Sequence, residues 1–197
     1  MHFENGTVDG IRSISQRGLA ACWARLAKQG LPLFDDFDPG PRVHDPKQLV
    51  VWKVEASNGQ NNFRALYRGS LLDQAFNDGW IGKTLAEVTP PSLQSTILSA
   101  SDQCASTGCA VYTVLRTYDS ACFAIDLERL LLPFGKDGRV QQILASLQLI
   151  SLESTVERDK VVGSFEAQAE CVLSISIPAA SFTEFLSKSA KTQRRSA

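Results

Sequence analysis

The sequence predicts an α+β fold, namely a five-stranded antiparallel sheet with helices on one face and an amphipathic helix at the N-terminus. Three observations lead to this fold class. Apolar residues recur at helical spacing near the N-terminus and again over 91–107. Five other segments alternate apolar and polar residues, as strands do. The helical segments are grouped together rather than spread evenly among the strands.

The N-terminal helix is expected over residues 11–29. Leu19, Trp23 and Leu26 fall at helical spacing on one face. Gly30 suits a left-handed cap at the helix end. A helix this far ahead of the main domain must bury Trp23 against something. Both the domain's own sheet and the same helix of a second subunit are open possibilities at this point.

A turn-rich connector over 33–46 separates this helix from the strands. The first two strands are joined by Asn58-Gly59, which is a typical hairpin turn. Short helical pieces are expected over 70–90, and one longer helix over 91–107. The alternating segments predict strands at residues 49–55, 63–68, 110–117, 122–133 and 140–152.

This order predicts three parts: an N-terminal helix and connector (1–46), a main domain (47–152) and a C-terminal extension (153–197). In the extension, residues 171–177 alternate like a strand, and Ser181 opens a capping-box pattern for a short helix. The basic end of the extension could contact a partner or could be a solvated terminus. Its charged residues are Lys188, Lys191, Arg194 and Arg195.

The composition indicates one globular domain with extensions. Hydrophobic residues make up 44% of the chain and charged residues 21%, and the formal net charge is −1. This balance argues against nucleic acid and against a membrane as partners. The chain opens without a signal-peptide pattern and contains no apolar run long enough to span a bilayer. The five cysteines form no CxxC pair, so reduced thiols and a cytoplasmic location are expected.

Four short motifs follow one another along the connector and the main domain. They are Leu31-Pro32 with Asp38-Pro39, then Tyr67-Arg68-Gly69-Ser70, then Ile81-Gly82-Lys83-Thr84-Leu85, and finally Arg129-Leu130-Leu131-Leu132-Pro133 with Asp137-Gly138. Together with the element order, they resemble the PAS-domain superfamily and, within it, a bacterial PAS-like family of single-domain proteins, most of them uncharacterised. The resemblance spans about residues 20–152. It implies a sensory or adaptor role in the cytoplasm and implies no enzymatic activity.

Two departures from better-known PAS subtypes bear on cofactors. Haem-binding members resemble one another in a histidine on the long helix, and residues 91–107 contain none. Photosensory flavin-binding members carry a reactive cysteine ahead of that helix, and no cysteine occurs between Gly69 and Pro91. No cofactor is therefore expected, which leaves a small organic ligand or an empty cavity.

The candidates for a ligand pocket are Phe76, Trp80, Ile97, Tyr112 and Phe123. In a PAS-like fold the cavity lies between the helical block and the sheet. An aromatic ring with a polar edge can orient a ligand there. Plain core packing explains the same residues and is the competing interpretation.

No catalytic or metal site is expected. The only histidines are His2 and His44, and neither has neighbours suited to a nucleophilic triad. Asp35, Asp36 and Asp38 fit turns better than a cation site, because the EF-hand spacing is absent. The chain is therefore not expected to be an enzyme.

The functional expectation is a stand-alone sensory or adaptor module of signal transduction. It would bind a small ligand, a protein partner or both, and it would signal through protein–protein contact. The expected partners are a second copy, held as a homodimer through Leu19, Trp23 and Leu26, and an unknown signalling protein. Two alternatives are a dimerisation or interaction module with a filled core, and an unrecognised enzyme that acts on a small molecule.

Overall fold

The centre of the structure is a seven-stranded mixed sheet in the order β1-β7-β4-β5-β6-β2-β3. The structure is a computed structural model that describes residues 1–40, 43, 45–57, 59–75, 79–118, 124–151 and 169–182. The strands are β1 (Glu4–Asn5), β2 (Leu49–Ser57), β3 (Gln60–Arg68), β4 (Ala110–Tyr118), β5 (Ala124–Lys136), β6 (Arg139–Ser151) and β7 (Glu170–Ile177).

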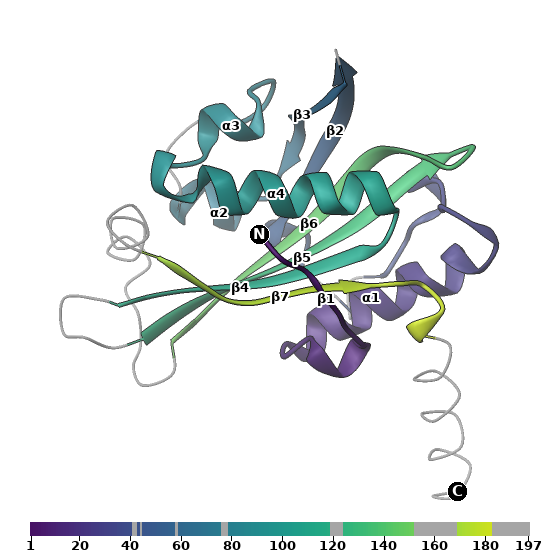
Figure 1. The fold of residues 1–197 in the computed structure, drawn as a ribbon, viewed down its shortest axis with the longest axis horizontal. Helices are drawn as coiled ribbons and strands as arrows, with labels where there is room; N and C mark the ends of the chain where they lie inside the picture. Colours follow the sequence, from purple (N-terminus) through teal and green to yellow (C-terminus); the bar gives the residue numbers. More distant parts are fainter. Residues whose placement is uncertain are drawn as a thin grey trace, which may run out of the picture.

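Four α-helices are found among the described residues, and they lie on both sides of the sheet (Figure 1). None of these helices is long and apolar enough to cross a bilayer. The helices are α1 (Ile14–Leu26), α2 (Ser70–Ala75), α3 (Leu85–Val88) and α4 (Pro91–Thr107).

The element order expected of a PAS-like domain is present. β2 and β3 form a hairpin, α2 to α4 follow, and β4, β5 and β6 then run antiparallel in succession. β6 also pairs with β2, so five strands lie in the order β4-β5-β6-β2-β3. The α+β class is therefore confirmed, and the order of the elements is the one expected of a PAS-like fold.

The expectation of five strands in a wholly antiparallel sheet is wrong. β7, which follows the three consecutive strands in the chain, pairs antiparallel with β4, and β1 pairs parallel with β7. The alternation over 171–177 predicts a strand there but does not show which strand it joins, because pairing is decided by contacts distant in sequence. β1 has only two residues, which is too short for any periodicity to reveal.

The expectation that helices cover one face is also wrong. One core lies between α4 and the sheet and contains Ile97 and Leu131. The other lies between α1 and the sheet and contains Trp23, Leu130 and Leu132. Successive residues of β5 point to opposite faces. The apolar run over 130–134 of β5 is typical of a strand buried on both faces, whereas the alternation over 124–129 favours a single covered face.

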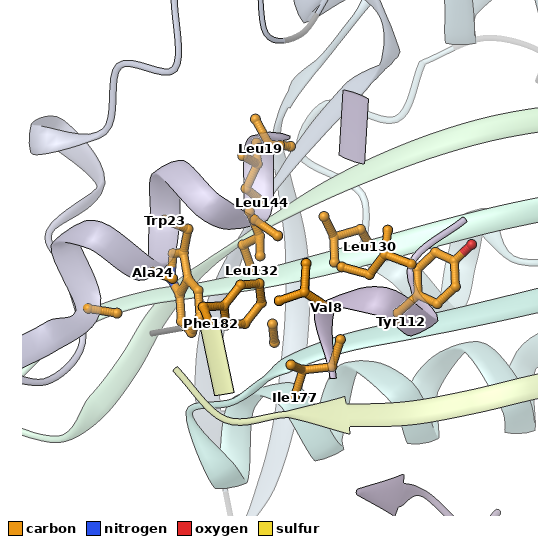
Figure 2. Close-up of a cluster of buried hydrophobic side chains, with 14 of the residues drawn as sticks. Val8, Leu19, Trp23, Ala24, Tyr112, Leu130, Leu132, Leu144, Ile177 and Phe182 are labelled. Carbon is orange, nitrogen blue, oxygen red and sulfur yellow. The ribbon is translucent and has the colours of Figure 1, made fainter. Parts of the chain in front are cut away.

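The helix α1 packs against the sheet of its own chain. Leu19 and Trp23 are fully buried in that core (Figure 2). The Trp23 ring meets Phe182 edge-on, with ring centroids 5.9 Å apart. Leu26, the third residue expected to face a second subunit, is 42% exposed. A dimer contact through Leu19 and Trp23 is therefore wrong, because the chain's own sheet encloses both side chains.

Candidate functional site

A cavity of about 60 Å³ lies between the sheet and the helical segment that includes α3 and α4. Leu85 from α3 and Ile97 from α4 line one side. Leu127 and Ala145 line the other side from β5 and β6. The cavity lies on the α4 face of the sheet, where a PAS-like fold is expected to hold a ligand. Its walls are largely apolar, as ligand pockets usually are.

The segment before α3 is fixed to the edge of the sheet by backbone hydrogen bonds. The amide of Ala65 donates to the carbonyl of Lys83 at 3.0 Å, and the amide of Gly82 donates to the carbonyl of Ala65 at 2.9 Å. Thr84 and Glu87 then form a capping box that starts α3. Gly82 has a φ of 80° and open space around its Cα. A glycine suits this position because the backbone adopts a left-handed conformation there, and no neighbouring backbone would be displaced by a Cβ.

Two tryptophans form one wall of the cavity. Trp52 on β2 is buried, and Trp80 in the loop before α3 is half-buried. Their ring centroids are 5.9 Å apart, with planes inclined at 33°. The Arg68 guanidinium carbon lies 4.9 Å from the centroid of the Trp80 ring, within the range of a cation–π contact. The Trp80 side chain is therefore held between the sheet and a cation.

Among the described residues that line the cavity, Arg129 alone is charged. It lies in the middle of β5 and is 3% exposed. Its Nη1 has no hydrogen-bond partner, and no salt bridge joins it to a carboxylate within the part of the chain that the structure describes. Burial lowers the pKa of Arg129 to about 10, so the guanidinium is still cationic at neutral pH. A buried cation without a counter-charge is strongly destabilising.

The Cys171 thiol does not supply that counter-charge. Cys171 lies on β7 and interacts electrostatically with Arg129. Burial raises the pKa of Cys171 above its ordinary value, although the positive charge of Arg129 opposes this rise. The thiol is therefore neutral at physiological pH, and no charge among the described residues compensates the guanidinium.

Thr113 provides a second unpaired polar group beside Arg129. The two residues are directly opposite each other on β4 and β5, and such cross-strand neighbours have Cβ atoms roughly 5 Å apart. Val111 and Leu115, which flank Thr113 at alternate positions, both belong to the α4-side core, as Leu131 does on β5. Thr113 is fully buried, and its Oγ1 has no hydrogen-bond partner among the described residues. Unpaired buried groups of this kind are rare in native proteins.

The structure brings together only part of the set of candidate pocket residues. Trp80 and Ile97 line the cavity. Tyr112 lies on the opposite face, in the core under α1 (Figure 2), because successive residues of β4 alternate in direction. Burial raises the pKa of Tyr112, and its hydroxyl accepts a hydrogen bond from the Arg12 amide at 3.3 Å. Phe76 and Phe123 lie outside the described residues.

Sequence reasoning missed Arg129 and Thr113 as members of the site. The available signal was that Arg129 occupies the alternate position between Leu127 and Leu131, on the face of the strand that is otherwise apolar. Alternation alone would place Glu128 and Asp126 on a solvated face of β5, whereas the structure buries both, with 1% exposure each. When both faces of a strand are covered, the alternation of its residues does not show which polar side chains are buried and which are solvated.

A second polar cluster ties the start of α1 to the sheet. Asp126 accepts hydrogen bonds from Arg12 at 2.7 Å and from Arg116 at 2.8 and 2.9 Å. The Gln16 side chain donates to the Ser146 carbonyl at 3.1 Å. This cluster lies on the face of β5 opposite the cavity. Within the described part of the chain, no group of histidine, cysteine or acidic residues is arranged to hold a metal ion.

A larger groove of about 550 Å³ lies on the α1 side of the sheet, between the connector and strands β2, β3 and β6. Phe34 and Phe37 line it from the connector, and Val51 and Tyr67 line it from the sheet. Leu66, also in the lining, is 45% exposed. Nothing among the described residues indicates what covers this groove.

No family model matches the chain, and no curated protein matches it. Among solved structures, the chain is similar to an RNA-binding light-oxygen-voltage receptor, with 22% identity and a TM-score of 0.37 over 63% of this chain and 34% of that chain. It is also similar to a variant of RsLOV, with 15% identity and a TM-score of 0.35 over 60% of this chain and 71% of that chain. The chain thus covers about a third of the first structure's length.

The element order, the sheet and the cavity between helices and sheet define a class of protein. The described residues form an α+β domain with the element order expected of a PAS-like fold, extended by β1 and β7 at one edge of its sheet and covered by α1 on the face away from the cavity.

Proposed function

We propose that this protein is a sensory module of signal transduction. It would bind a small molecule in the cavity beside Arg129, and a protein partner would detect the conformational change that binding causes. The observation that supports this best is the cavity itself, which has apolar walls, two tryptophans and one unpaired guanidinium. Ligand pockets typically combine an apolar lining with a few polar groups that orient the ligand. At about 60 Å³, the cavity suits a ligand of a few heavy atoms, since drug-sized pockets measure roughly 300–1,000 Å³.

Strand β5 offers a path from the cavity to α1. Arg129 and Leu131 face the α4 side, and Leu130 faces α1. A shift of β5 on ligand binding would therefore reach both the α1 core and the pair between Asp126 and Arg12. For the mechanism to work, the ligand must bind more tightly to one arrangement of α1 than to another.

The outer face of α1 is the surface at which a partner would detect such a change. Ile14 is 79% exposed and Leu26 is 42% exposed, although both are apolar. The partner, whether a second copy or another signalling protein, would contact this face rather than the buried side that holds Trp23. A cytoplasmic location and the absence of enzymatic activity are part of the proposal.

Native mass spectrometry of the protein purified without added ligand tests this function. The wild type is expected to retain a small extra mass that denaturing conditions remove. Ala145→Leu fills the cavity, because Ala145 lines it and is 1% exposed. Ala56→Leu is the matched control, since Ala56 lies on β2 and is exposed. Retention of the mass by Ala56→Leu and its loss from Ala145→Leu would support the proposal.

The alternative of an interaction module with a filled core predicts a different result. The wild type would then carry no extra mass, and small molecules would leave its thermal transition unchanged. That outcome would overturn the sensory proposal. An enzyme that acts on a small molecule would instead convert an added ligand, which mass spectrometry of the small-molecule fraction would detect.

A further inference from the structure

The unpaired polar groups beside the cavity indicate the charge of its ligand. We propose, building on the sensory function above, that the ligand is a short-chain monocarboxylate. Its carboxylate binds the Arg129 guanidinium and the Thr113 hydroxyl, and its aliphatic tail lies against Ile97, Leu127 and Ala145.

Of the two polar residues, Arg129 lines the cavity and Thr113 is its cross-strand neighbour. They come from directly opposite positions of adjacent antiparallel strands, on the same face of the sheet. A guanidinium donates hydrogen bonds in a planar fork that fits a carboxylate, and a threonine hydroxyl can donate one more. Both have an atom without a partner among the described residues. A carboxylate at this position would satisfy both atoms.

The charge also decides between ligand classes. A neutral ligand would leave the Arg129 cation without a counter-charge in a buried site, which is the costly arrangement. A phosphate carries nearly two negative charges, and Arg129 is the single charged residue that the described part of the chain contributes to the lining. A monocarboxylate balances one cation with one anion. The small volume and the apolar walls then favour a short aliphatic tail over a polar or ring-bearing one.

The stability of the ligand-free protein provides an independent reason to assign Arg129 a binding role. Replacing a buried, poorly compensated charge with an apolar side chain of similar length often stabilises a protein. A residue that lowers stability and has no structural partner among the described residues is typical of a functional site. Arg129→Met is therefore expected to raise the melting temperature of the ligand-free protein while it removes carboxylate binding.

The test measures the thermal transition and the binding isotherm of the full chain with defined probes. Potassium butanoate and hexanoate are compared with butanamide and hexanamide, which have similar shapes and no charge, and with potassium chloride at equal ionic strength. The acids are expected to raise the melting temperature and to bind at least about tenfold more tightly than the amides, because hydrogen bonds to charged groups are the stronger ones. The amides and chloride are expected to give small shifts.

Three variants assign the binding to these residues. Arg129→Met is expected to weaken acid binding by about 10- to 100-fold, and Thr113→Val is expected to weaken it several-fold while preserving side-chain shape. Arg139→Met is the matched control, because Arg139 is exposed at the start of β6, away from the cavity lining. It should bind the acids as the wild type does.

The outcomes that overturn the inference are distinct from the failure of the sensory function. Equal binding of acids and amides, or unchanged acid binding by Arg129→Met, would overturn the carboxylate assignment and leave a ligand-binding sensor in place. A shift with chloride as large as with butanoate would show an inorganic anion site and would also overturn it. Absence of binding by every probe, with no co-purified mass in the native spectrum, would overturn both proposals.

Discussion

The indole nitrogen of Trp23 donates a hydrogen bond to the carbonyl oxygen of Pro133 at 2.7 Å, inside the core that joins α1 to the sheet. Pro133 lies within β5, which continues to Lys136, rather than at the end of the strand. The ladder between β4 and β5 already ends at Leu131. The missing amide hydrogen of Pro133 therefore interrupts no bond to β4, and its carbonyl holds α1 in place.

Loss of this hydrogen bond is expected to destabilise the protein. Trp23→Phe leaves the buried Pro133 carbonyl without its partner, which costs about 1–3 kcal/mol in the free energy of unfolding. Denaturant titration monitored by circular dichroism measures the change. Leu26→Ala, a truncation on the exposed side of α1, should change the free energy by roughly 0.5 kcal/mol or less. Similar effects of the two variants would contradict the assignment of Trp23 to the core.

Asp126 is expected to make the stability of the protein depend on acid pH. The hydrogen bond from Arg116 is the main cause that lowers the pKa of Asp126 below its ordinary value, and Arg12 adds to it. A carboxyl group whose pKa is lowered in the folded state stabilises the fold above its unfolded pKa of about 3.9, and this contribution is lost as the pH falls through the folded pKa. Asp126→Asn should therefore lower stability at pH 7 by about 1–3 kcal/mol.

The pH profile is the control for that variant. The difference in unfolding free energy between the wild type and Asp126→Asn should shrink steadily on acidification below the unfolded pKa. A difference that stays constant down to the lowest pH at which the protein is folded would show that the two ion pairs contribute no stability.

Glu128 lies two residues after Asp126 on β5, and its charge is expected to lower the stability of the protein at neutral pH rather than to raise it. Burial is the main cause that raises the pKa of Glu128, and a hydrogen bond with Tyr112 opposes the rise. An acid whose pKa is raised in the folded state favours folding at pH below its unfolded value of about 4.3, and this contribution is lost as the pH rises through the folded pKa. Glu128→Gln removes the charge and keeps the side-chain shape, so it should stabilise the protein at pH 7.

Denaturant titrations at pH 7 and at acid pH check this prediction. The increase in the free energy of unfolding caused by Glu128→Gln should be present at neutral pH. It should be absent at pH values where the wild-type carboxyl is protonated. A loss of stability at pH 7 would mean that the Glu128 charge is compensated in the folded state.

Two glycines of the hairpin between β5 and β6 are expected to tolerate alanine very differently. A Cβ on Gly135 would overlap the carbonyl oxygen of Arg139 on the facing strand, so Gly135→Ala should cost about 3 kcal/mol or more. Gly138 has a φ of 73° and open space around its Cα, so Gly138→Ala should cost only the left-handed backbone penalty of about 1–2 kcal/mol. Thermal unfolding of the two variants measures both. Equal losses would contradict the register of the hairpin.

The sequence by itself determined the local elements of this protein. The helical spacing before Gly30 and over 91–107, and the alternation that gives β2 to β6, are patterns within short segments. Local backbone geometry is enough to produce them. Even β7 was visible as an alternating segment. The order of these elements was sufficient to indicate a PAS-like fold.

The tertiary structure alone decided how those elements combine. β1 and β7 joined the sheet, and α1 covered its second face with Trp23, because strand pairing and helix docking depend on contacts between residues far apart in sequence. The same contacts buried β5 on both sides, which removed the distinction between its buried and solvated residues. Tyr112 was thereby placed away from the cavity. Arg129 came to lie in it without a counter-charge among the described residues, and no local pattern encodes that relationship.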